Sequence, residues 1–316
     1  MGYKGKLITL FVIAVGLTIL YLTIGANGNW EYVLPRRGYK IAAIILTGAT
    51  IAFSTMVFQT ITNNRILTPS IIGLDSLYLL LQTFIIFTFG SLSVVMINKY
   101  INFGLSIVLM VIFAAILFKL LFKREGQNIY FLLLVGLVFG TLFGSLSTFM
   151  QVLIDPNEFL MVQNRMFASF NNVNTDIFWI SFLLIIVVSI YSYRYVKYLD
   201  VLSLGKEHAV NLGVNYDQIV KRLLIIIAIL VAIATALVGP ITFLGLLVAN
   251  VAHEFMKSYQ HKYLISGAIL ISIVALVGGQ LIVERIFSFS TPLSVIINFV
   301  GGVYFLYLLL KETKKW

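Results

Sequence analysis

Cysteine is absent from this 316-residue sequence, and acidic residues are scarce, at 12. Without cysteine the chain has no disulfide framework, no thiolate metal site and no cysteine nucleophile. Charged residues of both signs make up only 11% of the chain, whereas 60% of it is hydrophobic and its mean hydropathy is +1.01. A soluble core of this length cannot bury so much apolar surface. The chain therefore requires lipid as its solvent.

Long apolar runs recur along the sequence, each bounded by charged residues, glycine, proline or asparagine. A membrane helix needs about 20 apolar residues, and only helices or closed barrels satisfy their backbone groups in lipid. Barrel strands would alternate apolar and polar residues, whereas these runs are continuous. We therefore expect an all-α integral membrane protein with about ten transmembrane helices. The expected spans are 7–24, 39–59, 76–90, 102–122, 129–150, 176–193, 223–239, 241–252, 263–283 and 292–310.

Two short spans, the first apolar run and two long connections need separate interpretation. The spans 76–90 and 241–252 are short for full crossings, so each is tilted, extended by its flanks or partly re-entrant. The first run exceeds the roughly 7–15 residues of a signal-peptide core, so we interpret it as an uncleaved helix rather than a secretory signal. Two connections, an outer one at 154–176 and an inner one at 195–222, are long enough to hold structure of their own. We expect a single transmembrane domain, 1–316.

The 22 basic residues are unevenly shared between the two sides of this arrangement. An even number of spans places both termini on one side, and most basic residues lie there too, so the positive-inside rule predicts cytoplasmic termini. Cytoplasmic loops and anionic headgroups then account for the net charge of +10, and with no soluble basic domain we expect no nucleic-acid partner. The basic residues left outside are Arg36, Arg37, Lys40, Lys99, Arg165 and Arg285.

The charge map also bears on the source of energy. No charged residue falls at the middle of an expected span, although ion-coupled carriers commonly place an ionisable group there. A secondary carrier is therefore the weaker hypothesis. The chain also has no G-x-x-x-x-G-K-[ST] phosphate loop, because Asp200 stands where the first glycine before Gly205 and Lys206 should be. We expect a transporter subunit that is not itself an enzyme and draws on ATP hydrolysis by a separate chain.

Histidine gives no metal site or catalytic cluster. His253 and Glu254 begin like a zincin helix, but Lys257 occupies the position of the second ligand. We expect His208, His253 and His261 to be solvated in cytoplasmic loops. With no cluster of histidine and acidic residues at one depth, a membrane-embedded enzyme is not indicated, and we expect neither a cofactor nor a metal.

Three glycines, Gly136, Gly140 and Gly144, recur every four residues in the span 129–150. This spacing places them on one helix face, where another backbone can approach closely. They serve either simple helix packing, which we favour, or the lining of a translocation path.

Three stretches resemble the FecCD family of ABC importer permeases, which carry iron siderophores, haem and vitamin B12. Gly-Ala-Thr-Ile-Ala at 48–52 leads through Gln59 and Asn64 to Pro-Ser-Ile-Ile-Gly at 69–73, similar to G-A-x-L-A-x-x-G-x-x-x-Q and N-P-L-A-x-P-x-x-L-G. Residues 204–214 are similar to L-G-x-E-x-A-x-x-L-G-V, and residues 239–248 to G-x-I-x-F-[IV]-G-L-[IV]-V. Arg65 departs from the pattern by replacing a proline, and Asp75 by replacing a small residue.

The resemblance implies a type II ABC importer permease fold in a bacterial cytoplasmic membrane. The implied partners are a second permease subunit, which we expect to be a paralogue, an ATP-binding-cassette ATPase dimer, and a binding protein that delivers the cargo. The expected cargo is a ferric siderophore, with haem or a corrinoid as the alternatives. Residues 58–78 and 29–40 look closest to permeases for catecholate siderophores such as petrobactin.

The resemblance also assigns roles to residues. Residues 202–214 would be the element that couples to the ATPase, as a pair of short helices. Arg37, Lys40 and Arg285 would receive acidic groups of the binding protein, the alternative being that they anchor helix ends at headgroups. Gln59 and Asn64 join the three glycines as candidates for the translocation path or helix packing. The residues assigned to coupling are Leu204, Gly205, Lys206, Glu207, Ala209, Leu212, Gly213 and Val214.

Overall fold

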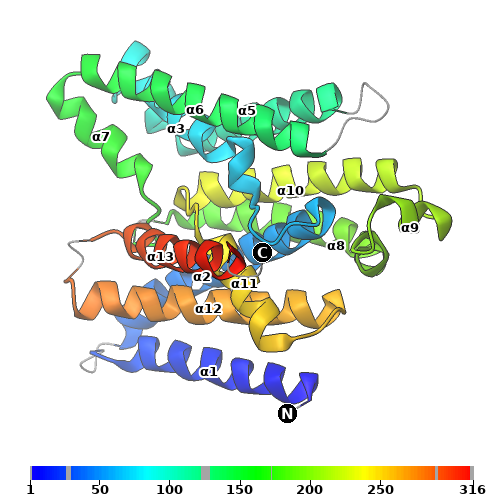
Figure 1. Ribbon diagram of the computed structural model, residues 1–316. Helices are drawn as coiled ribbons and strands as arrows, with labels where there is room; N and C mark the ends of the chain where they lie inside the picture. Colours follow the sequence, from blue (N-terminus) through cyan, green and yellow to red (C-terminus); the bar gives the residue numbers. More distant parts are fainter. Residues whose placement is uncertain (1, 26–29, 122–128, 172, 289–290, 314–316) are drawn as a thin grey trace.

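The computed structural model describes residues 2–25, 30–121, 129–171, 173–288 and 291–313. Helices dominate this part of the chain (Figure 1). In chain order they are α1 (Tyr3–Thr23), α2 (Trp30–Thr62), the 3-10 helix η1 (Pro69–Ile72), α3 (Leu74–Phe89), α4 (Val94–Ile97), α5 (Lys99–Leu121), α6 (Ile129–Leu153), α7 (Pro156–Met166), α8 (Thr175–Leu202), α9 (Lys206–Asn211), α10 (Tyr216–Val238), α11 (Leu244–Met256), α12 (His261–Arg285) and α13 (Leu293–Thr313).

The all-helical class predicted from the sequence is confirmed. Each expected span overlaps one long or medium helix: α1, α2, α3, α5, α6, α8, α10, α11, α12 or α13. Within the described residues, seven helices are long and apolar enough to cross a membrane, while α3, α11 and the described part of α13 are shorter apolar helices. Ten crossings and cytoplasmic termini therefore remain predictions.

The helices lie side by side, with α2 and α10 near the centre (Figure 1). In the most apolar stretch of α2 and of α10, 67% of the residues are buried, against 17% for α1 and for α6. The outward faces of these outer helices expose large apolar side chains such as Ile8, Leu134 and Val138. Such faces suit contact with lipid tails or with another transmembrane subunit.

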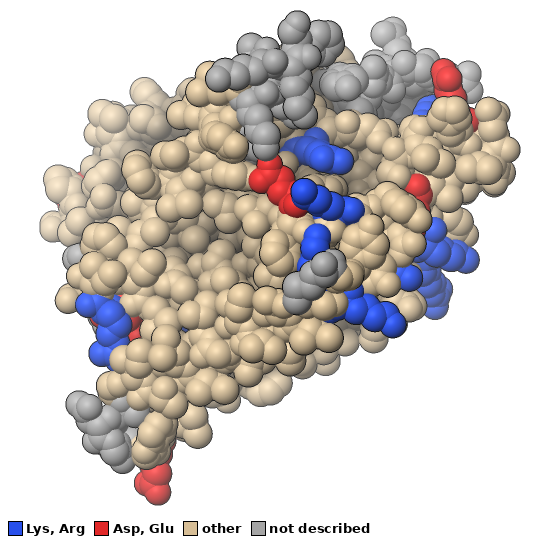
Figure 2. Space-filling view, turned by 60° about the horizontal axis from the view of Figure 1, so that its bottom comes forward, with Lys and Arg blue, Asp and Glu red and all other residues tan. Residues whose placement is uncertain are grey.

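The bundle has two distinct ends in Figure 1. The N-terminus and α9 lie at one end, which we call the α9 end; α7 and the start of α13 lie at the other, the α7 end. In Figure 2, turned about the horizontal axis, lysine and arginine gather mainly toward the side of the α9 end, with a smaller group at the opposite side. This asymmetry supports the orientation expected from the positive-inside rule.

The two long connections differ from one another in length. Residues 154–176 hold α7, which begins where the Asp155 side chain accepts a hydrogen bond from the Asn157 N–H and Pro156 occupies the first turn. The inner connection is shorter than expected, because α8 runs on to Leu202 and α10 begins at Tyr216. It contains one short helix, α9, instead of the expected pair.

The link between α2 and α3 turns back into the bundle. The side-chain amides of Gln59 and Asn250 both donate to the Arg65 carbonyl, over 2.5 and 2.8 Å, and thereby hold the turn. Helix α3 then begins inside the bundle, which accounts for the shortness of the expected span. Asp75 lies in its first turn and is only 8% exposed. Asp75 stands just before its expected span, 76–90, as the sequence placed it, yet it is buried in the bundle rather than solvated.

Candidate functional site at the two ends of the bundle

Glycines shape the short helix at the α9 end. Gly205 precedes α9 with φ +92° and ψ 168°, and Gly213 follows it with φ +80°. After α9 the Val214 N–H donates to the Ala209 carbonyl (3.0 Å), which closes the helix through a left-handed Gly213. Backbone angles like those of Gly205 are essentially restricted to glycine. The turns around α9 therefore depend on these two residues.

Helix α9 is attached to the bundle on one side and presents apolar side chains on another. Ala209 is fully buried, and the Lys206 ammonium binds the Asp217 carboxylate at the start of α10 over 2.8 Å. Leu204, Val210 and Leu212 are instead 51–62% exposed. Exposed leucine and valine at a polar bundle end favour a protein partner over water. Glu207 is also exposed, and Val214 is partly buried against the core.

A buried histidine joins three helices next to α9. His261, the first residue of α12, is 4% exposed; its Nδ1 lies 2.6 Å from Asp200 Oδ1 of α8, and its Nε2 lies 2.7 Å from Thr60 Oγ1 of α2. His253 lies within α11. The expectation of solvated loop positions is therefore wrong for His261 and His253, because α12 and α11 extend beyond the apolar runs that marked them, whereas His208 is exposed.

Replacing this histidine is expected to loosen the α9 end. His261→Ala removes two side-chain hydrogen bonds and leaves a small cavity, which should cost about 2 kcal/mol. His208→Ala, on the exposed face of α9, is the matched control and should be nearly neutral. Thermal unfolding of both variants in detergent measures the difference. Equal stability of the two variants would show that the side-chain hydrogen bonds of His261 do not stabilise this end of the bundle.

At the α7 end, arginines bind the last carbonyls of α1. The Arg37 guanidinium donates to the carbonyls of Tyr21, Leu22 and Ile24 over 2.7–3.1 Å, and Arg285 also donates to the Ile24 carbonyl. Positive charge at a helix C-terminus satisfies unpaired carbonyls and the helix dipole. Both arginines thus fix the end of α1 within this chain, and their expected roles in docking or at lipid headgroups stay predictions.

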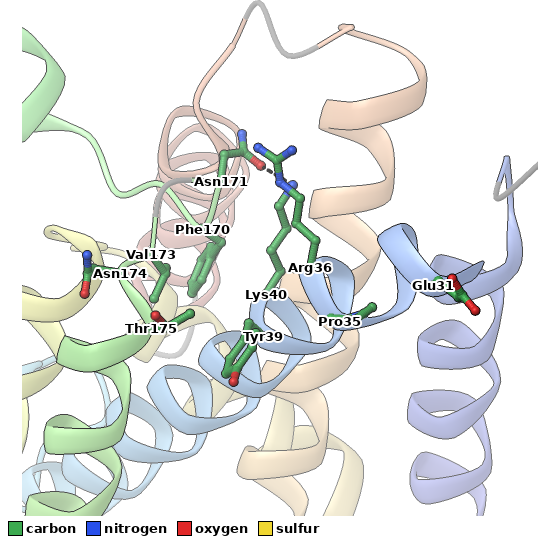
Figure 3. A pocket seen from close by; sticks show the side chains of 10 residues that line it. All are labelled: Glu31, Pro35, Arg36, Tyr39, Lys40, Phe170, Asn171, Val173, Asn174 and Thr175. Carbon is green, nitrogen blue, oxygen red and sulfur yellow. Dashed lines mark hydrogen bonds between the residues drawn. The ribbon is translucent and has the colours of Figure 1, made fainter. Parts of the chain in front are cut away.

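Lys40 makes a different contact at the same end. Its ammonium binds Glu284 Oε1 at 3.2 Å and Asn171 Oδ1 at 3.0 Å, and the lysine and glutamate side chains are 15% and 7% exposed. Figure 3 shows Lys40 and Arg36 reaching from α2 toward Asn171, at the edge of a cavity of about 670 Å³. The sequence did not single out Glu284, because its partner is 244 residues away.

The pair of Lys40 and Glu284 is expected to matter through its burial. Lys40→Met leaves a largely buried carboxylate without its cation and should destabilise the chain by about 3 kcal/mol. Adding Glu284→Gln removes the orphaned charge and should restore most of the stability, since glutamine can still accept from Tyr21. Thermal unfolding of the single and double variants tests this. A double variant no more stable than Lys40→Met would count against the ion pair.

Two of the three glycines in the span 129–150 pack against another segment of this chain. An added Cβ at Gly136 would lie 2.8 Å from the Ile72 Cα, and one at Gly140 would lie 3.4 Å from the Gly73 Cα. Nothing lies within 4 Å of the corresponding point at Gly144. Gly136 and Gly140 therefore receive the backbone of η1 and Gly73, whereas the space beside Gly144 is open.

Gln59 and Asn64 shape the turn between α2 and α3. Gln59 is 3% exposed and holds the Arg65 carbonyl, and Asn64 Oδ1 accepts from the Ile66 N–H at 2.9 Å. Asn250 of α11 holds the same Arg65 carbonyl, and Asp75 lies buried in the first turn of α3 beyond this turn. In the sequence, the only signal for Asp75 was its departure from the family pattern.

Comparison with known proteins identifies relatives along the full length. Residues 7–311 match the sequence model of the FecCD transport family. The petrobactin import system permease YclO of Bacillus subtilis strain 168 is 63% identical, over 98% of this chain and 97% of that protein. The petrobactin import permeases FatC and FatD of Bacillus anthracis are 38% and 27% identical, over 89% and 96% of this chain and 79% and 90% of theirs.

A solved structure supports the fold independently. A metal-chelate type ABC transporter in an inward-facing conformation superposes with a TM-score of 0.85, at 23% identity, over 98% of this chain and 100% of that one. The chain therefore shares the fold of that transporter subunit.

Proposed function

The chain belongs to the FecCD transport family, and we propose that it is the multi-pass permease subunit of an ABC importer that moves ferric petrobactin, or a closely similar siderophore, across a bacterial cytoplasmic membrane. The observation that carries this proposal is the 63% identity to a petrobactin import permease over nearly the whole of both chains. The chain supplies the membrane path, and a separate ATPase supplies the energy.

The proposed assembly pairs this chain with a paralogous permease. Bacillus anthracis has two petrobactin import permeases, and they resemble this chain to different degrees, 38% for FatC and 27% for FatD. Two different permeases in one system favour a heterodimer over a pair of identical chains. The exposed apolar faces of the outer helices are suited to such a partner.

The two ends of the bundle have separate proposed roles. We place the ATPase dimer at the α9 end, where Leu204 and Leu212 are exposed beside glycine-dependent turns. We place the binding protein at the α7 end, where Arg37, Lys40 and Arg285 provide positive charge. These cations would attract acidic groups of the binding protein. Because they also hold α1 and α12, they would in addition keep the docking surface at the α7 end in position.

Uptake of radioactive iron tests the cargo. In cells lacking their own siderophore permeases, this chain expressed with its partner permease, ATPase and binding protein should import ferric petrobactin. Haem or cobalamin uptake instead would assign the alternative cargo. Petrobactin uptake that persists without the ATPase would indicate a secondary carrier and contradict the proposal.

Reporter fusions test the orientation. Lys99 begins α5 and Lys262 lies in the first turn of α12, and we expect them on opposite sides of the membrane, with Lys262 cytoplasmic. Paired fusions at the two positions, one active only in the cytoplasm and one only outside, give the answer directly. The same side for both would contradict the arrangement.

A further inference from the structure

Asp75 is a buried carboxylate without a cationic partner. Its Oδ1 accepts a 3.4 Å hydrogen bond from the Thr235 hydroxyl, while Oδ2 has no hydrogen-bond partner. None of the ion pairs among the described residues includes it. A carboxylate removed from water in this way must be neutralised by a proton or by a bound cation.

The position of Asp75 is deep in the bundle. Gly73, two residues before Asp75, packs against Gly140 of α6. Gly140 lies eleven residues after the first residue of α6 and thirteen before its last. At about 1.5 Å per residue these are distances of roughly 16 and 20 Å from the helix ends. The carboxylate therefore lies far from both polar ends of the bundle.

Oxygen atoms surround this carboxylate. A cavity of about 20 Å³ adjoins it, where the α2–α3 link, α10 and the start of α11 meet. A volume of this size accommodates one particle as large as a water molecule. Ser70 and Thr242 lie beside the carboxylate, and Thr242 is exposed, so the cavity is reached from the surface of the chain. The hydroxyl-bearing residues of the lining are Thr55, Thr68, Ser70, Thr235 and Thr242.

We propose that this cavity binds one Na⁺ ion, held by the Asp75 carboxylate and the hydroxyl oxygens around it. Hard cations prefer such oxygen ligands, and interrupted helices inside membrane proteins are places where Na⁺ is coordinated. A single carboxylate among neutral hydroxyls balances one positive charge, which favours a monovalent ion over a divalent one. The ion would join α3, α10 and α11 where each begins or ends inside the bundle.

Thermal unfolding of the purified assembly in NaCl and in choline chloride, at equal ionic strength, tests the site. Saturating Na⁺ is expected to raise the unfolding midpoint by about 4 °C, since a ligand that binds only the folded state stabilises it. Asp75→Asn should abolish this shift. Glu31→Gln, which removes an exposed carboxylate at the α7 end, is the matched control and should retain it.

Direct binding keeps the test decisive if Asp75→Asn fails to fold. Radioactive Na⁺ should be retained by the unaltered assembly and displaced by unlabelled Na⁺ but not by choline, and Thr235→Val should weaken the retention. A Na⁺ shift of equal size in Asp75→Asn would overturn the proposal. So would an assembly that retains no Na⁺ and whose stability follows pH only when Asp75 is present, because a proton would then neutralise the carboxylate.

Discussion

Replacing both Gly205 and Gly213 with valine is expected to abolish transport while leaving the chain in the membrane. Both glycines have positive φ, and nothing lies within 4 Å of an added Cβ at either one. Valine would therefore strain the backbone without a clash, by about 1–3 kcal/mol at each position. The turns around α9 should rearrange, and cargo-stimulated ATP hydrolysis and uptake should both fall by about tenfold or more.

Single substitutions at the same two sites sharpen this expectation. Gly213 adopts the left-handed conformation that asparagine tolerates, so Gly213→Asn should retain most of the transport. Gly205 has ψ 168°, outside that region, so Gly205→Asn should be defective. Gly104→Val, at a helical glycine with open space, is the control. Full coupling in the double valine variant would show that α9 does not transmit the ATPase motion.

Substituting leucine along the glycine face of α6 is expected to give a graded loss of stability. At Gly136 the added side chain meets the backbone of Ile72, which has no rotamer by which to move aside. The strain should cost about 3 kcal/mol and displace η1, and with it α3. Gly140→Leu meets the backbone at a larger distance and should cost less. Thermal unfolding and uptake, measured on the same variants, separate folding from transport.

Gly144→Leu is the matched control, because nothing lies within 4 Å of a Cβ added at this position. Unchanged stability of this variant is expected from the open space. If its uptake also falls, the open face at Gly144 contacts the cargo or the second permease. Gly136→Leu with unaltered stability would contradict the packing of η1 against α6.

The apolar runs predicted the helices well because membrane helices are encoded locally. Each expected span overlaps a helix, and the error lies at the boundaries, where α8 continues through Arg194 and Lys197 to Leu202. Charged residues such as Arg194 and Lys197 lower the local hydropathy, so hydropathy alone ends the expected span before the helix itself ends. Both long connections were expected to hold structure of their own, and the outer one contains α7 and the inner one α9. That the inner element is a short helix was expected only through the family resemblance.

Contacts between distant residues could not be predicted in this way. Lys40 and Glu284 are paired across 244 residues, and His261 reaches Thr60 across 201. The sequence places these side chains near helix ends, but nothing in hydropathy tells a paired side chain from a solvated one. The depth of Asp75 depends on the return of the α2–α3 link into the bundle, which a linear reading of spans treats as a surface loop.

ATP hydrolysis by the reconstituted assembly tests the central claim most directly. Liposomes containing this chain, its paralogous permease and the ATPase are supplied with the binding protein, with and without ferric petrobactin. We predict that the loaded binding protein stimulates hydrolysis and that iron accumulates inside only when ATP is present on the α9 side. A rate of ATP hydrolysis that the loaded binding protein does not change, or iron uptake without ATP, would contradict the assignment as an ABC importer permease.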